Sequence, residues 1–385
     1  MNPRIIAFYL PQFHPFKEND EWWGKGFTEW TNVGKAKPLF KGHNQPRVPT
    51  ELGYYDLRLP IVREQQAEMA REAGVEAFCY WHYWFGNGKR LIADIFDEVL
   101  YSGKPDFPFC LGWANHSWYA KNWNADGTTT NKLLIEQTYP GIEDEKMHFA
   151  FLLKAFKDKR YTKVNGCPLF YIFDPTSLPK EYLDNFRKWS KEEGFPDLYI
   201  VANISGALNV KTNFLSQGYD AVSYQRLAGM TTNKILLKYG DLGNKISYHL
   251  RQFRGKMLHR PPFMTDYKKF MPYLITDKER ERQVIPTIVP QWDHTPRSGW
   301  NGSLFVNTSP SLFYEHVKQA FDCLKNKPEE ELLVEEARGR LVFLKSWNEW
   351  GEGNFMEPDL TFGRGFIEAL RKAIDECNSK QNNTN

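Results

Sequence analysis

The stretch LVFLKSWNEW (341–350) begins like a buried strand and ends in polar and aromatic side chains. Its start is apolar on both faces, which is typical of a strand buried in a parallel sheet. Seven further stretches follow the same plan, with an apolar first half and hydrogen-bonding or aromatic residues at the end. They are RIIAFYL (4–10), VEAFCYWHYWF (75–85), PFCLGWAN (108–115), CPLFYIFDP (167–175), LYIVANISG (198–206), YDAVSYQ (219–225) and VIPTIVPQW (284–292).

Helical patterns alternate with these eight predicted strands. Strands that alternate with helices indicate a parallel sheet, and eight repeats in 385 residues predict a single (β/α)8 TIM barrel with loop insertions. The alternative is an open doubly wound sheet, whose usual G-x-G-x-x-G fingerprint does not occur in the sequence. The predicted helices are 61–73, which ends at Gly74, then 91–100, 143–158, 179–193, 309–326 and 366–377.

The chain reads as one domain, residues 1–378, followed by a polar tail, 379–385, that we expect to be disordered. Residues 227–283 form a longer, mixed insertion whose role the sequence leaves open. The apolar run near the N-terminus is too short for a signal peptide, and no apolar run is long enough to span a membrane. Five cysteines without C-x-x-C spacing favour free thiols, so we expect a cytoplasmic location.

Charge and composition narrow the choice of partner. The formal net charge of +3 is nearly neutral, so nucleic-acid binding is not indicated. Aromatic residues make up 16% of the chain, with 13 Trp and 19 Tyr. A large core needs aromatic residues, but so does a sugar-binding cleft, because the apolar face of a pyranose packs on an aromatic ring. Composition alone does not decide between the two.

The polar strand ends supply the candidate site residues. In a TIM barrel the active site lies at the carboxyl ends of the strands, so these side chains are expected to share one pocket. The loop GFTEW (26–30) adds Glu29, for which a sugar contact and a salt bridge are equally good readings. The predicted substrate-binding residues are Tyr9, Glu29, Trp30, Tyr80, His82, Trp113, Asn115, His116, Trp118, Tyr171, Asn203, Tyr224, Gln291, Trp292, Asp293, Trp347 and Asn348.

Glu349 and Glu352 are the predicted catalytic pair. Just past a strand end, carboxylates three residues apart can point the same way. Two close carboxylates do not ionise equally, which gives an acid and a base at one pH, as glycoside hydrolysis requires. The alternative is that both simply face the dipole of a helix N-terminus. Asn348 is expected to orient Glu349, whereas scattered histidines match no compact ligand motif, so neither a metal nor a cofactor is predicted.

The segment SWNEWGEGNFMEP (346–358) resembles the N-E-W-x-E-G segment of family 99 glycoside hydrolases, the endo-α-mannosidase and endo-mannanase group. The chain is more similar still to the bacterial GH99-like proteins called WbsX, of polysaccharide and lipopolysaccharide gene clusters. The similar stretches extend from residue 7 to 358. They include AFYLPQFHP, WWGKGFTEWTNV, LGYYDLRLP, GVEAFCYWHYWF, WANHSW and PQWDHTPRSG.

This resemblance implies a retaining α-glycosidase site. Glu349 would assist attack by the 2-hydroxyl of the substrate, through a 1,2-anhydro sugar, and Glu352 would be the general acid/base. The chain departs from the group in two places, with His116 where W-A-N-E-x-W has glutamate and W-N-A-D-G (123–127) where it has W-D-G. These departures affect the local substrate contacts and leave the glutamate pair intact.

Three functions remain open on the sequence. The first is a retaining glycoside hydrolase or transglycosidase acting on α-linked bonds of a bacterial oligosaccharide or polysaccharide. The second is a WbsX-type glycosyltransferase that uses a nucleotide sugar, although the sequence has no D-x-D element of the kind that holds a diphosphate through a cation. The third is a carbohydrate-binding barrel without turnover, which the intact glutamate pair disfavours.

Overall fold

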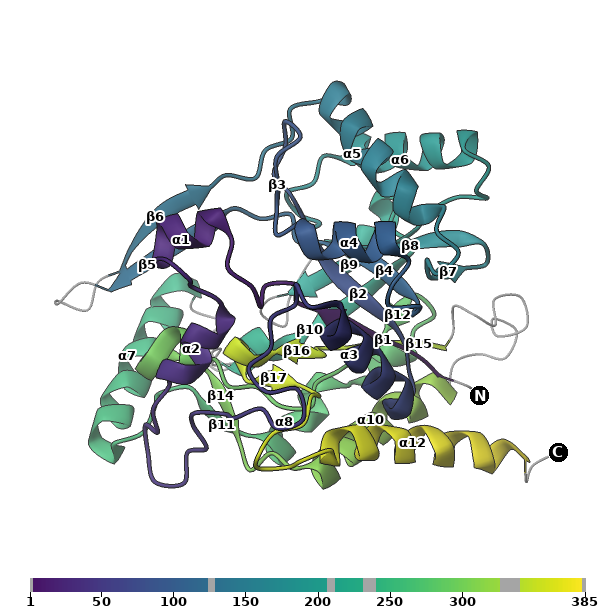
Figure 1. The fold of residues 1–385 in the computed structure, drawn as a ribbon. Helices are drawn as coiled ribbons and strands as arrows, with labels where there is room; N and C mark the ends of the chain where they lie inside the picture. Colours follow the sequence, from purple (N-terminus) through teal and green to yellow (C-terminus); the bar gives the residue numbers. More distant parts are fainter. Residues whose placement is uncertain (1–2, 124–128, 206–211, 231–239, 326–339, 383–385) are drawn as a thin grey trace.

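The computed structural model describes residues 3–123, 129–205, 212–230, 240–325 and 340–382. Parallel strands form the centre of the molecule, and helices surround them (Figure 1). All eight predicted strand positions are confirmed, with shorter bounds. In chain order they are β1 (Arg4–Tyr9), β2 (Val75–Trp84), β4 (Phe109–Trp113), β8 (Cys167–Ile172), β9 (Tyr199–Ser205), β10 (Ala221–Gln225), the pair β12 (Val284–Ile285) and β13 (Thr287–Ile288), and β15 (Leu341–Leu344).

The seventh strand closes the barrel although it is broken in two. β12 pairs with β10, whereas β13 pairs with β15, which in turn pairs with β1. Pro286 separates the halves, because proline has no N–H to donate to a neighbouring strand. Each half therefore bonds a different neighbour, and the parallel sheet closes into the predicted (β/α)8 barrel.

The predicted helices are confirmed with small shifts at their ends. α3 ends at Gly74, whose φ of 81° is the left-handed conformation expected of a C-terminal glycine cap. α12 continues to Asn382, so the expected disordered tail is helical over its first residues, and 383–385 lie outside the described part of the chain. The bounds are α3 (Pro60–Ala73), α4 (Asp94–Ser102), α5 (Ile142–Phe156), α6 (Lys180–Glu192), α10 (Pro310–Lys325) and α12 (Gly365–Asn382).

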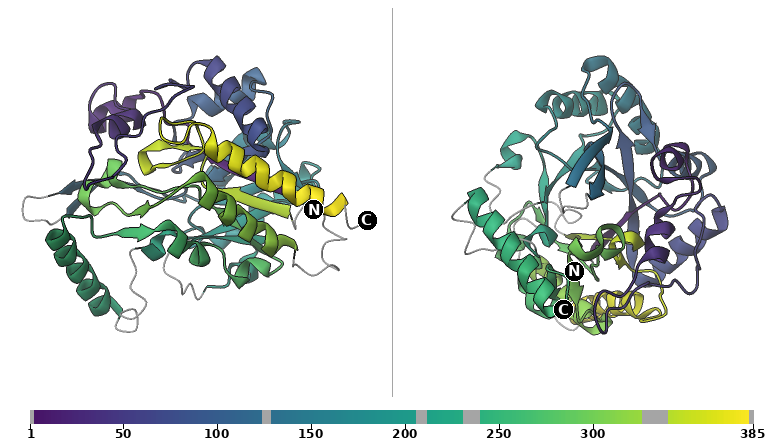
Figure 2. Two further views of the ribbon diagram at one scale, coloured as in Figure 1. Left: turned by 90° about the horizontal axis from the view of Figure 1, so that it is seen from below. Right: turned by 90° about the vertical axis from the view of Figure 1, so that its left-hand side faces the viewer.

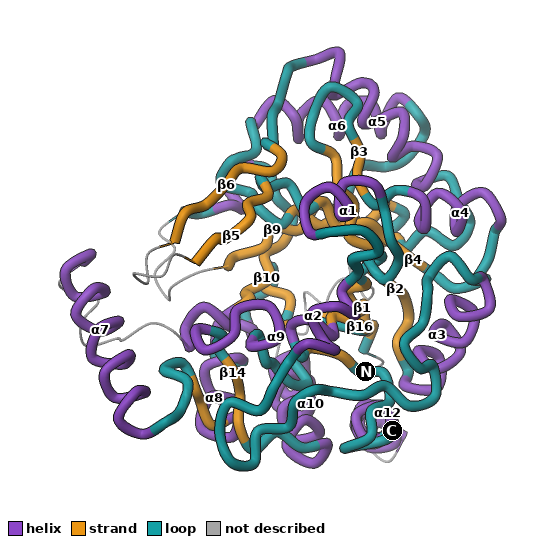
Figure 3. Tube along the Cα trace, turned by 60° about the vertical axis from the view of Figure 1, so that its left-hand side comes forward, coloured by secondary structure: helices purple, strands orange, loops and turns teal. Residues whose placement is uncertain are grey.

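Insertions enlarge the barrel at several connections (Figure 3). Helices α1 (Lys17–Trp23) and α2 (Glu29–Lys35) follow β1, and a hairpin of β5 (Trp118–Trp123) and β6 (Thr129–Ile135) follows β4. The insertion 227–283 contains η2 (Arg226–Met230), α7 (Gly240–Leu258), β11 (Met264–Asp266), α8 (Tyr267–Leu274) and η4 (Asp277–Arg280). The remaining elements are β3 (Arg90–Leu91), β7 (Lys163–Val164), η1 (Phe214–Gln217), α9 (Thr295–Ser298), η5 (Gly299–Asn301), β14 (Leu304–Val306), β16 (Asn348–Glu349), η7 (Trp350–Glu352) and β17 (Asn354–Phe355).

Aromatic side chains fill the barrel interior. Phe8 stacks on Trp81 with ring centroids 4.8 Å apart, and it also packs against Tyr171 and Phe343. The next residue in β1, Tyr9, points to the other side of the sheet and donates from Oη to Gln66 Oε1 of α3 at 2.6 Å. Successive residues of a strand face opposite sides, so this alternation decides which strand residues can reach a site inside the barrel mouth.

Candidate active site

Beyond β15 the chain folds into a small hairpin that carries both glutamates. β16 pairs antiparallel with β17, and the 3-10 turn η7 joins them. Gly353 ends this turn with a φ of 55°, and a Cβ there would lie 2.6 Å from the Cβ of Asp293. Glycine is therefore required both by the backbone conformation and by the approach of the strand-seven loop.

Glu349 is buried, with 5% of its surface exposed. Its Oε1 accepts a hydrogen bond from Trp81 Nε1 at 2.9 Å, and its Oε2 lies 3.2 Å from the ammonium of Lys345. Burial raises the pKa of Glu349, and the neighbouring charge of Glu352 raises it further, against the opposing effect of Lys345. The two carboxyl groups also share a hydrogen bond, in which Glu349 is the donor.

Glu352 has the opposite electrostatic environment. Burial would raise its pKa, but the nearby cations Arg297 and Lys345 and the hydrogen bond from Glu349 together lower it. Arg297 Nη1 lies 2.5 Å from Glu352 Oε1, and Lys345 Nζ lies 3.8 Å from Oε2. The opposite shifts mean that a proton held by the pair resides on Glu349 in preference to Glu352.

Glu29 joins the cluster through Arg297. Its Oε2 lies 3.0 Å from Arg297 Nη2, so the salt-bridge reading of Glu29 describes its contact in the structure. Although burial opposes the charge of Arg297, Glu29 and Glu352 raise its pKa. A Cβ on Gly351 would lie 2.0 Å from Glu29 Oε2, so only glycine allows this close approach.

Gly351→Ala is expected to lower the free energy of unfolding by about 1–3 kcal/mol, because the added methyl group displaces the Glu29 carboxylate from Arg297. The matched control is Gly34→Ala in α2, where a Cβ would meet nothing within 4 Å and alanine favours the helix. Denaturant unfolding of both variants measures the difference. Equal stability of the two variants would contradict the packing described for Gly351.

A third carboxylate, Glu357, lies in the same segment and is enclosed by protein donors. It accepts hydrogen bonds from Trp350 Nε1, Gln66 Nε2 and Tyr55 Oη at 2.6, 2.6 and 2.9 Å. Burial outweighs these donors and raises its pKa to about 7. Glu357 therefore fixes the hairpin against α3 and the loop that carries Tyr55.

The raised pKa of Glu357 predicts a pH-dependent stability. Because the folded pKa lies above the ordinary value of 4.5, its stabilising effect is complete below pH 4.5 and is lost as the pH rises through about 7. Glu357→Gln removes this titration, so the free energy of unfolding should fall less between pH 5 and 8 than in the wild type, by up to about 3 kcal/mol. Denaturant unfolding at both pH values tests this, and parallel pH profiles would contradict it.

Aromatic and imidazole side chains surround the carboxylate pair. Tyr83, on the same face of β2 as Trp81, is buried, and its pKa is raised first by burial and then by the charge of Glu349. The ring of Trp292 lies 5.6 Å from Lys345 Nζ and stacks on His294, whose Nε2 is 3.8 Å from Glu352 Oε1. This combination of aromatic faces and charged groups suits a sugar. No cluster of three His, Cys, Asp or Glu side chains that could hold a metal ion occurs in the described part of the chain.

The predicted site residues fall into distinct groups. Glu29, Trp292, Glu349 and Glu352 come together as described. Tyr171 and Asn203 lie inside the barrel and bond each other at 3.0 Å. His116 packs on Phe173, a neighbour of Trp81, and Trp118 packs on Tyr83. Five side chains are not part of the site proposed below. Tyr9, Tyr80, His82 and Trp113 pack toward the helices, and Trp347 packs on Phe78 of β2.

The remaining predicted residues hold loops in place. Asp293 accepts from His43 Nε2, Gln45 Nε2 and both donors of Thr295. Asn348 exchanges hydrogen bonds with the backbone of Leu10 and has no such contact with Glu349, contrary to the expected orienting role. The other contacts are Asn115 with Tyr139 and the backbone of Asp174, Gln291 with Phe355 O, Trp30 with Tyr55 O, and Tyr224 with the cation of Arg226.

Trp81, Lys345 and Arg297 contact the glutamates but were not among the predicted site residues. Lys345 was detectable, because a lysine that directly follows four apolar strand residues must be buried or paired. Trp81 differs from the predicted Tyr80 and His82 only in the face of β2 that it occupies. Arg297 lies in the similar stretch PQWDHTPRSG, but its pairing could not be predicted because Glu29 and Glu352 lie far from it in the sequence.

Comparison with known proteins decides the family. The model of the family described as Glycosyltransferase WbsX matches residues 5–370. The chain belongs to the WbsX family. It is also 32% identical over 372 residues to the uncharacterized protein WxcX of Xanthomonas campestris pv. campestris, in two strains. That alignment covers 96% of this chain but 49% of WxcX, so this WbsX-family chain spans about half the length of the curated relatives it matches.

Solved structures support the fold of this WbsX-family chain. The GH99 endo-α-mannosidase from Bacteroides thetaiotaomicron in complex with BIS-TRIS-propane has a TM-score of 0.55 at 14% identity, covering 98% of each chain. A glycoside hydrolase-like protein has a TM-score of 0.53 at 16% identity, covering 97% of this chain and 94% of the other. At these identities the likeness concerns the fold alone, and it confirms the (β/α)8 barrel that the sequence predicts.

Proposed function

We propose that the chain is a carbohydrate-active enzyme that breaks α-linked glycosidic bonds of a bacterial polysaccharide with retention of configuration. The observation that carries this proposal is the hydrogen-bonded pair Glu349 and Glu352, whose pKa values are shifted in opposite directions at the end of the eighth barrel strand. A glycosidase needs one carboxyl group that is protonated and one that is ionised, and opposite pKa shifts in two neighbouring glutamates favour that combination.

The roles implied by the family resemblance need the shared proton to move. The pKa shifts favour a proton on Glu349, whereas a general acid is needed at Glu352. A sugar whose 2-hydroxyl donates to Glu349 favours the ionised form of that carboxyl group. The proton then passes along the existing hydrogen bond to Glu352, which leaves Glu349 as the base and Glu352 as the acid.

The reaction then proceeds in two balanced steps. In the first, the 2-oxygen attacks the anomeric carbon as Glu349 takes its proton, and the glycosidic bond breaks as Glu352 protonates the departing oxygen. In the second, water or another sugar attacks the anomeric carbon and gives its proton to Glu352. The 1,2-anhydro ring opens, and the 2-oxygen recovers its proton from Glu349. Two inversions at one carbon retain the configuration.

The surrounding residues support these roles. Lys345 lies between the two carboxylates and limits the cost of their ionisation, while Arg297 holds Glu352 and Glu29. Trp81 fixes Glu349 through Oε1, and Trp292 and Tyr83 offer aromatic surfaces beside the pair. Glu29, Trp292 and His294 are therefore our proposed contacts for sugar hydroxyls and ring faces.

A nucleotide-sugar glycosyltransferase is the second candidate, because the family that matches the chain is described as glycosyltransferases. The same carboxylate pair can serve transfer as well as hydrolysis, since the second step accepts water or a sugar hydroxyl. The two candidates differ in the donor, which is a glycoside in one case and a sugar diphosphate in the other.

One assay separates the candidates. The chain is incubated with aryl α-glycosides of the common hexoses, with α-linked bacterial oligosaccharides and with nucleotide sugars plus acceptor oligosaccharides. Release from glycosides or oligosaccharides without a nucleotide supports the proposal, and Glu352→Gln should lower release from unactivated substrates by about 10²–10⁴-fold. Turnover that requires a nucleotide sugar supports the glycosyltransferase. Binding of oligosaccharides without turnover of any donor would contradict both.

A further inference from the structure

Helix α7 lies at the edge of the molecule (Figure 2) and exposes a stripe of apolar side chains. Ile246, Leu250, Phe253 and Met257 are spaced four, three and four residues apart and are 44, 60, 65 and 65% exposed. That spacing places them on one side of the helix. Single exposed apolar side chains are common on protein surfaces, but a contiguous row of large ones marks an interaction surface.

Cations accompany this stripe. Residues 246–260 contain Arg251, Arg254, Lys256 and Arg260 and no aspartate or glutamate. An apolar stripe flanked by basic residues is typical of a helix that lies in the headgroup layer of an anionic membrane. In the described part of the chain, none of the helices is both long and apolar enough to cross a bilayer.

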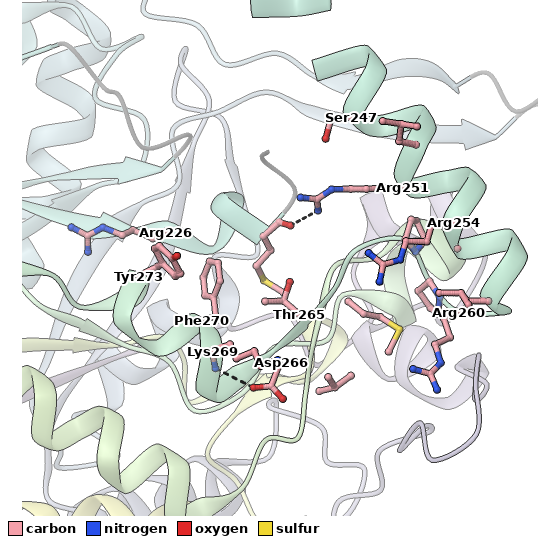
Figure 4. A pocket seen from close by; sticks show the side chains of 18 residues that line it. Arg226, Ser247, Arg251, Arg254, Arg260, Thr265, Asp266, Lys269, Phe270 and Tyr273 are labelled. Carbon is pink, nitrogen blue, oxygen red and sulfur yellow. Dashed lines mark hydrogen bonds between the residues drawn. The ribbon is translucent and has the colours of Figure 1, made fainter. Parts of the chain in front are cut away.

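A basic pocket lies on the inner side of α7, opposite α8 and β11 (Figure 4). Its volume is about 910 Å³, and Arg251 and Arg254 project into it from α7. Arg254, Arg260 and Lys269 form no ion pair with another described residue. The acid on its wall, Asp266, already accepts from Asn307 Nδ2 and Lys269 N. Apolar residues complete the lining, among them Leu250, Met264 and Phe270.

We propose that the pocket binds the phosphate of an anionic membrane lipid while the stripe of α7 lies among the lipid headgroups. Leu250 belongs both to the stripe and to the pocket lining, so one amphiphile can reach both. A soluble phosphate compound would occupy the pocket but leave the stripe in water. A second copy of the chain would set two rows of arginine and lysine side by side, where they repel.

Membrane binding at α7 is structurally connected to the carboxylate site. Gln252 Nε2 donates to Asn301 Oδ1 at 2.7 Å, and Asn301 follows Arg297 by a few residues in the same connection. Trp292 Nε1 donates to Ser303 Oγ at 3.0 Å, next to β14, which pairs with β11 of the pocket wall. The insertion 227–283 would thereby hold the active site close to a membrane surface.

Co-sedimentation of the full 385-residue chain with vesicles tests this proposal. We expect the chain to bind vesicles made of equal parts of phosphatidylcholine and phosphatidylglycerol, and to bind them more weakly as salt is added. We expect no binding to vesicles of phosphatidylcholine alone. Phe253→Ser should weaken the binding by at least about tenfold. Arg254→Gln should weaken it by about fivefold, since a cation near an anionic surface contributes roughly that factor.

Matched controls lie elsewhere on the surface. Tyr101→Ser in α4 removes an aromatic ring that is 74% exposed, and Lys188→Gln in α6 removes an exposed cation. Both should bind vesicles like the wild type. Circular dichroism melts of all variants confirm folding, with Met257→Ser as a second stripe variant should Phe253→Ser unfold.

Several results would overturn the proposal. These are equal binding to neutral and anionic vesicles, no binding to either, or binding that Phe253→Ser and Arg254→Gln leave unchanged. A dimer in light scattering that Phe253→Ser dissociates would assign the stripe to a second copy. Thermal stabilisation by inorganic pyrophosphate without vesicle binding would assign the pocket to a soluble anion. Sedimentation requires no glycan turnover, so its failure is distinct from failure of the carboxylate proposal.

Discussion

Replacing Glu352 by glutamine is expected to lower kcat/KM for an unactivated α-linked oligosaccharide by about 10²–10⁴-fold, which is the usual contribution of a general acid. Glu349→Gln should cause a loss of the same order, because the 2-hydroxyl then has no base. Both glutamines preserve the shape of the side chain but cannot take up or release a proton as a carboxyl group does. Steady-state kinetics on the oligosaccharide that the substrate panel identifies would measure both effects.

The control for this experiment is Glu357→Gln, a buried glutamate of the same segment that contacts Trp350, Gln66 and Tyr55 instead of the pair. It should retain most of the activity at pH 6. Losses of equal size in all three variants would show that the segment as a whole is fragile and would contradict a special role for Glu349 and Glu352.

Arg297→Met is expected to lower the free energy of unfolding by about 3 kcal/mol, because it removes the cation that pairs with Glu29 and leaves Glu352 with the more distant Lys345, 3.8 Å away. The side chain of Glu29 is 5% exposed and that of Glu352 is 16% exposed, so water can hydrate their charges only slightly once Arg297 is removed. Arg58→Met is the matched control, since its partner Asp56 lies at the surface and exposed pairs contribute about 0–1 kcal/mol. Denaturant unfolding of both variants gives the comparison.

A second substitution tests the cause of that loss. Adding Glu29→Gln to Arg297→Met removes one of the stranded charges, so the double variant should be more stable than Arg297→Met alone. An additive double variant, less stable than either single one, would show that Arg297 acts through packing and that the ionic account is wrong.

The strands, their order and the barrel could be predicted from the sequence, because apolar segments with polar ends recur with helical segments between them. Which residues of each strand face the barrel interior could not be predicted. The start of β2 is apolar on both sides, so its pattern shows no alternation from which the inward residues follow. A one-residue error in the face selected Tyr80 and His82, which pack toward α4 and α5, in place of Trp81 and Tyr83.

The glutamate pair could be predicted because both members lie in one short segment. The ion pairs of this segment could not be predicted. Glu29, Arg297 and Glu352 come from three connections that only the closed barrel brings together. Asn348 also has hydrogen-bond partners that could not be predicted from its neighbours in the sequence. Its neighbour in sequence is Glu349, but its hydrogen bonds go to Leu10 at the end of the first strand, where they join the two ends of the closed sheet.

The transferase name of the family and the hydrolase-like fold are compatible in physical terms. A retaining site releases the leaving group first and accepts the second nucleophile afterwards. In the proposed mechanism, exclusion of water by side chains such as Trp81, Tyr83 and Trp292 would favour a sugar hydroxyl over water at that second step. The ratio of transfer product to hydrolysis product from an α-linked oligosaccharide would then measure how well the site excludes water.

In the proposed mechanism Glu352 delivers a proton to the leaving group while Glu349 acts on the sugar. The most direct test of these roles compares Glu352→Gln and Glu349→Gln on two aryl α-glycosides of the same sugar, one with a 2,4-dinitrophenyl and one with an unsubstituted phenyl leaving group. We predict that the activated glycoside restores most of kcat/KM in Glu352→Gln, because kcat/KM reports the first step and 2,4-dinitrophenolate needs no acid there. It should restore little of kcat/KM in Glu349→Gln. Rescue of Glu349→Gln alone, or equal rescue of both variants, would contradict this assignment of roles.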